Sequence, residues 1–175
     1  MRHTLATALL CLLVQLLTAG AVHARTLSEP ELKAAFIYNF VQFTTWPNDL
    51  LAQAAVLNIC VRAQTPVALA LATLSGKLVH GVPLVVTALT EEHLPRCHVL
   101  FVEATEIGWL KKVSAPPTPM PILTLADLPD SSPAEAMIRL SLDGRKIVFD
   151  VDASEARRSR LAISSQVLAL ARSVK

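Results

Sequence analysis

The chain has 175 residues, and its 16 basic and 14 acidic residues leave a formal net charge of only +2. This near balance argues against nucleic-acid binding, which needs a surplus of Lys and Arg to neutralise phosphates. Hydrophobic residues make up 53% of the sequence, but beyond residue 24 no apolar run is long enough to span a bilayer, so we predict no direct membrane insertion of the mature protein.

Residues 1–24 have the organisation of a secretory signal peptide. Arg2 gives a basic start, the stretch 5–17 is almost entirely apolar, and residues 22–24 (Val-His-Ala) place small residues at the −3 and −1 positions of a cleavage site. We therefore predict cleavage after residue 24 and an exported protein whose single domain spans residues 25–175. The alternative is an uncleaved anchor.

A helix is predicted over residues 28–45. Ser28 and Glu31 have the spacing of a capping box, and Pro47 is expected to end the element because it biases the preceding residue away from helical geometry. Three aromatic residues at positions i, i+4 and i+7 share one face of this helix: Phe36, Phe40 and Phe43. We expect this aromatic face to pack against a sheet.

Beyond the helix, strand patterns alternate with short helical patterns. Strands are predicted at 56–62, 82–89, 97–103 and 120–125, with helices at 66–75 and 105–113. Alternation of this kind is typical of a parallel sheet that is covered by helices.

The pattern changes near the end of the chain. Residues 135–151 alternate apolar and polar side chains around Asp143-Gly144, which is a strong signal for an antiparallel hairpin. Two short helices are predicted after it, separated near residues 161–164. The fold class we predict is a layered α/β single domain, with a mixed, largely parallel sheet flanked by helices and an antiparallel hairpin at its edge.

Cleavage of the leader would leave two cysteines, Cys60 and Cys97, in an oxidising compartment. Both lie in predicted strands, and a bridge between them would stabilise the domain by about 4 kcal/mol in the chain-entropy model. Two free buried thiols are the alternative. A metal-binding pair is less favoured because no second pair of ligands stands at the spacing of a zinc site.

No motif in the chain predicts catalysis. There is no phosphate loop, dinucleotide fingerprint or nucleophile elbow, and the histidines His80, His93 and His98 lack the spacing of metal ligands on a helix. We therefore expect no enzyme activity, no cofactor and no metal. The group Arg157-Arg158-Ser-Arg160 stands out, either as a solvated helix face or as an interaction patch.

Taken in order, a series of segments resembles the YfiR-like family of periplasmic proteins. These segments are 33–47 (KAAFIYNFVQFTTWP), 57–61 (LNICV), 75–84 (SGKLVHGVPL), 97–102 (CHVLFV), 121–125 (PILTL), 137–140 (MIRL), 148–152 (VFDVD), 156–158 (ARR) and 161–171 (LAISSQVLALA). The resemblance covers nearly all of the expected mature chain. Asp152 is a departure, because the family usually has Asn there.

The resemblance implies a non-enzymatic, often dimeric α/β protein of the periplasm. Members bind the periplasmic sensor region of an inner-membrane diguanylate cyclase and repress it, which lowers cyclic di-GMP. Some members are sequestered in turn by an outer-membrane OmpA-like lipoprotein. The family disulfide corresponds to Cys60 and Cys97.

Our leading hypothesis is therefore an inhibitory protein whose partner contact lies in the segment 149–164. The candidate contact residues are Phe149, Asp150, Asp152, Arg157, Arg158, Arg160, Leu161 and Ile163. The alternative is a small-ligand sensor with a pocket at the carboxyl ends of the inner strands, where open α/β sheets bind ligands. A hydrolase is the least favoured reading.

Overall fold

The computed structural model describes residues 27–175 apart from 48–49, 63, 115–118, 130–134 and 145. The predicted signal peptide, residues 1–24, lies outside the described residues. None of the helices within the described part is both long enough and apolar enough to cross a membrane.

The described residues form one large sheet, a small two-stranded ribbon and several short helices. The strands are β1 (Thr44–Thr45), β2 (Leu57–Val61), β3 (Leu78–Val79), β4 (Val82–Ala88), β5 (Val99–Glu103), β6 (Leu123–Asp127), β7 (Ile138–Asp143), β8 (Lys146–Val151), β9 (Ala162–Ile163) and β10 (Ser173–Val174). The α-helices are α2 (Glu29–Gln42), α3 (Pro66–Ala72), α4 (Gly108–Val113), α5 (Ala153–Arg158) and α6 (Ser165–Leu168), and two 3-10 turns are η1 (Leu94–Arg96) and η2 (Ala104–Glu106).

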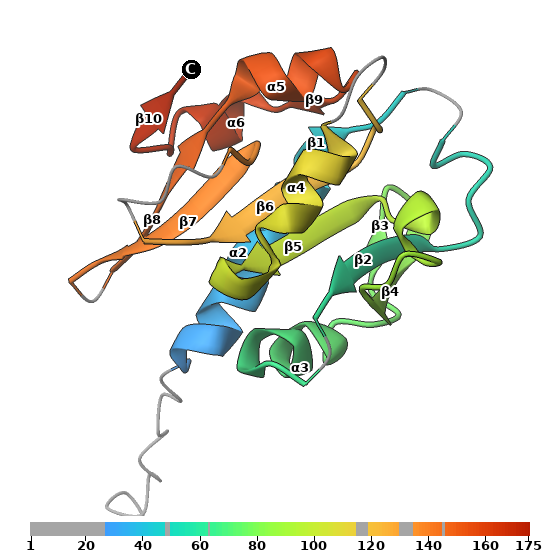
Figure 1. Cartoon of the computed structure of the whole chain (residues 1–175), viewed down its shortest axis with the longest axis horizontal. Coiled ribbons are helices and arrows are strands. Elements are labelled where there is room, and N and C mark those ends of the chain that lie inside the picture. Colours follow the sequence, from blue (N-terminus) through green and yellow to red (C-terminus); the bar gives the residue numbers. More distant parts are fainter. Residues whose placement is uncertain (1–26, 48–49, 63, 115–118, 130–134, 145) are drawn as a thin grey trace, which may run out of the picture.

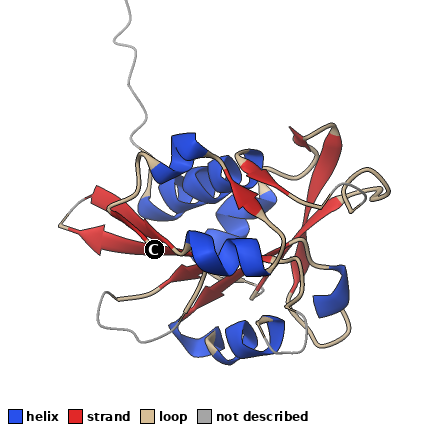
Figure 2. Ribbon diagram, turned by 90° about the horizontal axis from the view of Figure 1, so that it is seen from above, coloured by secondary structure: helices blue, strands red, loops and turns tan. Residues whose placement is uncertain are grey.

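The large sheet has the strand order β10-β8-β7-β6-β5-β2-β4-β3. Strands β4, β2, β5, β6 and β7 run parallel, whereas β7 with β8 and β3 with β4 are antiparallel pairs. Helix α4 lies on the opposite side of the sheet from α2 (Figures 1 and 2). The predicted fold class, a mixed and largely parallel sheet between helices, is confirmed.

The side chains of the inner strands belong to two hydrophobic cores, because alternate side chains point to opposite faces of the sheet. In β5, Val99 and Phe101 join the core that contains α2 and α3, whereas Leu100 and Val102 join the core that contains α4. This burial on both faces explains why the inner strands read as continuous apolar runs in the sequence.

Helix α2 begins at the predicted capping box. The Glu31 carboxylate accepts hydrogen bonds from the Ser28 N–H at 2.8 Å and from the Ser28 hydroxyl at 2.7 Å. The helix ends at Gln42, three residues before the predicted end, because Thr44 leaves the helix to pair in β1 and its hydroxyl donates to the Phe40 carbonyl. Phe43 therefore caps the helix instead of continuing it, and it is 42% exposed, so the prediction that it packs against the sheet as Phe36 and Phe40 do is wrong.

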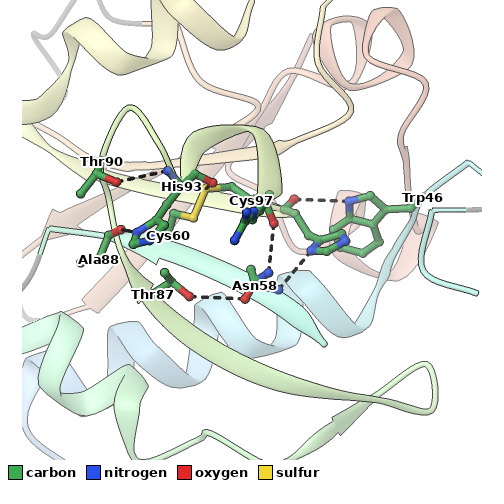
Figure 3. The surroundings of a disulfide bond; sticks show 10 residues. Trp46, Asn58, Cys60, Thr87, Ala88, Thr90, His93 and Cys97 are labelled. Atoms are coloured by element: carbon green, nitrogen blue, oxygen red, sulfur yellow. Dashed lines mark hydrogen bonds between the residues drawn. A yellow bond between two sulfur atoms is a disulfide. The ribbon is translucent and has the colours of Figure 1, made fainter. Parts of the chain in front are cut away.

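The disulfide between Cys60 and Cys97 is present, with the two Cα atoms 5.7 Å apart (Figure 3). Cys60 lies in β2, and Cys97 lies two residues before β5, its neighbour in the sheet. His98 adds a second link beside the bridge, because its Nδ1 accepts a hydrogen bond from the Asn58 N–H at 3.1 Å. The two neighbouring strands are therefore joined both covalently, at Cys60, and by a polar contact, at Asn58.

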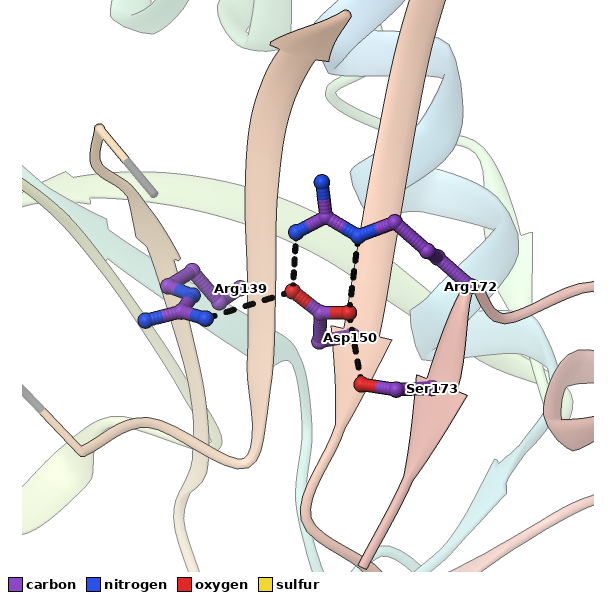
Figure 4. A network of polar contacts seen from close by, with 4 residues as sticks. All are labelled: Arg139, Asp150, Arg172 and Ser173. Carbon is purple, nitrogen blue, oxygen red and sulfur yellow. Dashed lines mark hydrogen bonds and ion pairs between the residues drawn. The ribbon is translucent and has the colours of Figure 1, made fainter. Parts of the chain in front are cut away.

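The last third of the chain follows the prediction, with two short strands added. The hairpin forms between β7 and β8, and the two helices α5 and α6 are separated by β9. Strand β10, which was not predicted, pairs outside β8. Asp150 secures it by accepting hydrogen bonds from Arg172 and from the Ser173 hydroxyl, while Arg139 contacts the same carboxylate (Figure 4).

Candidate interaction surface

The predicted contact segment 149–164 includes the end of β8, helix α5 and strand β9. Helix α5 begins at Asp152, whose carboxylate accepts hydrogen bonds from the Glu155 N–H at 2.8 Å and from the Ser154 hydroxyl at 2.7 Å. Burial alone would raise the pKa of Asp152, but these hydrogen bonds outweigh it and lower that pKa. Since Asn caps a helix as well as Asp does, the departure from the family at this position keeps the local structure.

Four of the eight candidate residues have structural roles. Phe149 is 5% exposed and Leu161 is 2% exposed, so both belong to the core. Asp150 holds β10, and Asp152 caps α5. The Arg172 side chain, with help from Ser173 and Arg139, holds the pKa of Asp150 far below its usual range despite the opposing effect of burial. These four residues support the surface and do not form it.

The remaining candidates include three exposed arginines, which we call the arginine turn (Arg157, Arg158 and Arg160). Arg158 forms an ion pair with Glu155 on the preceding turn of α5. Arg157 and Arg160 are also exposed, and neither forms an ion pair with any other described residue. Ile163, the eighth candidate, is partly buried in β9 against the core. The turn therefore presents two guanidinium groups with no internal acidic partner in the described chain.

The backbone of the arginine turn is fixed by a Schellman motif. The Arg160 N–H donates to the Arg157 carbonyl at 2.9 Å, and the Leu161 N–H donates to the Ala156 carbonyl at 2.8 Å. This geometry places Arg160 in the left-handed region at φ +60°, a position that glycine usually occupies. Buried Leu161 and Ala156 anchor the two ends of the motif, so the arginines stand on a defined scaffold.

Strand β9 connects the arginine turn to an apolar hollow on the face of the sheet that α2 covers. It pairs with β1, and the Ser164 N–H then donates to the Phe43 carbonyl at 2.9 Å as the chain enters α6. Between α2, β8 and α6 lies a pocket of about 240 Å³, which we call the phenylalanine pocket. Its lining residues are Phe36, Asn39, Phe40, Phe43, Phe149, Gln166, Val167 and Leu170.

Sequence reasoning placed Phe36 and Phe40 on one helix face but did not predict that this face borders a pocket. The missing side of the pocket comes from α6, which contributes Val167, and from the turn after it, which contributes the strongly exposed Leu170. These two residues stand three apart, the spacing of one helix face, and this was the signal available in the sequence.

A second hollow, of about 420 Å³, lies at the carboxyl ends of β5 and β6. Glu103 and Asp127 line it, and the buried Lys33 pairs with Asp127 at 2.5 Å and with Glu29 at 2.6 Å. Burial and the neighbouring Asp127 raise the pKa of Glu103. Burial opposes the charge on Lys33, but its two carboxylate partners raise its pKa overall.

The three histidines serve separate local contacts. His80 Nε2 lies 2.9 Å from the Thr44 carbonyl, His93 Nδ1 lies 2.9 Å from the Ala88 carbonyl, and His98 faces Asn58. No group of three or more His, Cys, Asp or Glu side chains in the described part of the chain could hold a metal ion.

Two comparisons with known proteins gave matches that cover most of this domain. A crystal structure of a conserved domain protein from Vibrio cholerae matches with a TM-score of 0.53 at 14% sequence identity, covering 85% of this chain and 61% of that chain. At this identity the likeness shows the fold alone, and this chain spans less than two thirds of the Vibrio protein. A search of curated proteins gave no match.

The family comparison is more informative. A sequence model described as YfiR/HmsC-like matches residues 30–172, from the first turn of α2 to the residue before β10. The match therefore includes the disulfide, the arginine turn and both sides of the phenylalanine pocket. The chain belongs to the YfiR/HmsC-like family.

Proposed function

We propose that this chain is a non-enzymatic periplasmic protein that binds the periplasmic sensor region of an inner-membrane diguanylate cyclase and represses it. The YfiR-like family is one of periplasmic regulators in diguanylate cyclase signalling, which supports the general role. A cleaved leader of residues 1–24 would deliver the domain to that compartment. The observation that carries the specific proposal is the arginine turn.

Arg160 is both exposed and held in an unfavourable backbone conformation. A non-glycine residue in the left-handed region costs about 1–2 kcal/mol, so Arg160 occupies a position where glycine would be more stable. Backbone strain of this kind persists most often where a side chain serves a function. Because Arg157 and Arg160 have no internal acidic partner among the described residues, their guanidinium groups are free to bind carboxylates from another protein.

Binding at the arginine turn would repress the cyclase by a shift between two states. A regulator changes the output of its partner only by its difference in affinity for the active and the inactive conformation. We therefore expect an acidic face on the cyclase sensor region that the inactive state presents to the turn. An outer-membrane OmpA-like lipoprotein that covered the same turn would relieve the repression.

The test measures intracellular cyclic di-GMP in the bacterium that carries the gene. Deletion should raise cyclic di-GMP, and the exported wild type should restore the low level. Arg157→Glu with Arg160→Glu should fail to restore it. The matched control, Arg96→Glu with Lys111→Glu, makes the same charge change at two other exposed sites and should behave as the wild type. Restoration by the arginine-turn variant would place the contact elsewhere.

One observation favours a second candidate function, a small-ligand sensor. The 420 Å³ hollow lies where open α/β sheets bind ligands and is within the usual size range of such pockets. A thermal-shift screen of the purified protein against a metabolite panel tests this function, since a bound ligand raises the melting temperature as its concentration exceeds the dissociation constant. Glu103→Gln should abolish any shift that arises there.

A further inference from the structure

We infer that the phenylalanine pocket receives one uncharged, bulky apolar side chain from the acidic partner segment that binds the arginine turn. The inference rests on the proposed function, because it adds a second point of contact to the same complex. It concerns a surface that none of the arginine-turn residues reaches, and it predicts the chemistry of the group that fills it.

The volume of the pocket favours a side chain over a free ligand. Small-molecule sites usually enclose about 300–1,000 Å³, and the phenylalanine pocket, at about 240 Å³, lies below that range. Anchors at protein interfaces are single aromatic or large aliphatic side chains that insert into pockets of this kind. None of the described lining residues is charged, so a charged anchor would lose its hydration without gaining a partner.

The exposed rim of the pocket also favours a partner side chain over a free ligand. Leu170 is 77% exposed and Phe43 is 42% exposed, although both line the pocket. A free small ligand would leave this rim in water and would itself remain partly solvated. A side chain that is attached to a partner surface brings its own cover, and that surface would remove both rim residues from water together with the anchor.

The pocket is also preformed. Its floor is an aromatic cluster in which the Phe40 and Phe149 ring centroids lie 4.8 Å apart and the Phe36 and Phe149 centroids 6.1 Å apart. Asn39 and Gln166 are exposed at the pocket and offer amide groups to a partner backbone. A rigid floor lowers the entropy that must be lost on binding.

The geometry links the pocket to the arginine turn through a single short segment. Strand β9 begins two residues after Arg160, and the residue after β9, Ser164, donates its N–H to the Phe43 carbonyl at the pocket rim. A partner segment that reached from the turn to the pocket would therefore follow β9. Charge complementarity at the turn selects an acidic partner, and the pocket selects an apolar residue within that partner.

The first experiment compares variants of the exported protein in the deletion strain. Leu170→Asp puts a charge on the rim and Asn39→Trp fills the pocket, and both change exposed positions, so folding should be retained in circular dichroism melts. Both should weaken partner binding more than tenfold and raise cyclic di-GMP towards the level of the deletion strain. Leu69→Asp, at a leucine that is 62% exposed on α3, should repress as the wild type does. Full repression by both pocket variants would overturn the inference.

The second experiment identifies what covers the pocket without relying on cyclase output. The photocrosslinker p-benzoylphenylalanine is placed at Leu170 in living cells, with Leu69 as the control site. We expect an adduct with another protein at an apolar residue flanked by Asp or Glu, and its loss in the Arg157→Glu, Arg160→Glu background. An adduct with a second copy of this chain, or none, would refute the anchor.

The two proposals fail in different ways. If the wild type does not lower cyclic di-GMP, the proposed function fails, and the crosslinked peptide alone then decides whether an acidic partner fills the pocket. If the wild type represses and the pocket variants repress equally well, only the anchor fails.

Discussion

Replacing Arg160 with glycine should make the protein more stable and remove its activity at the same time. The left-handed conformation at φ +60° costs an arginine about 1–2 kcal/mol, whereas glycine adopts it without that cost. Glycine also gains freedom in the unfolded chain, which offsets about 0.5–1 kcal/mol of the benefit. The net gain is therefore up to about 1.5 kcal/mol, with a middle value of about 0.75 kcal/mol, or about 1–4 °C in melting temperature for a domain of this size.

Arg160→Ala is the matched control because alanine keeps the strained backbone and removes only the guanidinium. Its free energy of unfolding, measured in urea by circular dichroism, should stay close to that of the wild type. Both variants should lose repression of cyclic di-GMP to the same degree. A destabilised Arg160→Gly protein would refute the argument from strain, and full repression by Arg160→Ala would refute the role of the side chain.

Three further predictions concern stability. Cys60→Ser should lower the free energy of unfolding by about 4 kcal/mol and the melting temperature by about 10 °C, and a thiol assay of the oxidised wild type should find neither Cys60 nor Cys97 free. Burial lowers the pKa of His98 below its usual 6.5, so the folded state binds the proton less well than the unfolded state. The free energy of unfolding should therefore be constant above pH 6.5 and should fall below it by at most about 1.4 kcal/mol per pH unit. Urea titrations of His98→Gln at a series of pH values should lack this slope. Asp150→Asn should cost about 1–2 kcal/mol and speed hydrogen exchange at the Lys175 amide, which bonds to the Val151 carbonyl; unchanged exchange would show that the carboxylate does not hold β10.

The long elements were predictable because their periodic patterns are local. The inner strands, the capping box and the Asp-Gly hairpin all carry signals within a few residues, and the structure contains them. Strands β1, β3, β9 and β10 have two residues each, too few to show a period. Strands β3 and β10 pair with β4 and β8 of the large sheet, and β1 and β9 pair with each other, so each of the four depends on a partner strand that the fold brings alongside. The early end of α2 has the same cause, since β1 competes with the last turn of the helix.

The candidate site was predicted as a segment and not as a surface. Sequence spacing placed Phe149, Leu161 and the arginines together, but it could not tell that the first two face the core. The left-handed backbone of Arg160 has no sequence signal, because a Schellman motif is normally recognised by its glycine. The phenylalanine pocket could not be predicted either, since its two halves come from opposite ends of the chain.

The contacts of α2 span nearly the whole sequence, and this has a consequence for how the protein reaches its compartment. Phe40 of α2 packs against Phe149, and Thr44, two residues after the helix, pairs with Ile163, so α2 and the strand that follows it cannot complete their packing until the last segments are available. Chains rich in such distant contacts fold slowly, because a long loop must close before any contact stabilises it. We expect the newly made chain to remain unfolded while it is threaded through an export channel, and to acquire its structure, with the bridge between Cys60 and Cys97, only on the far side.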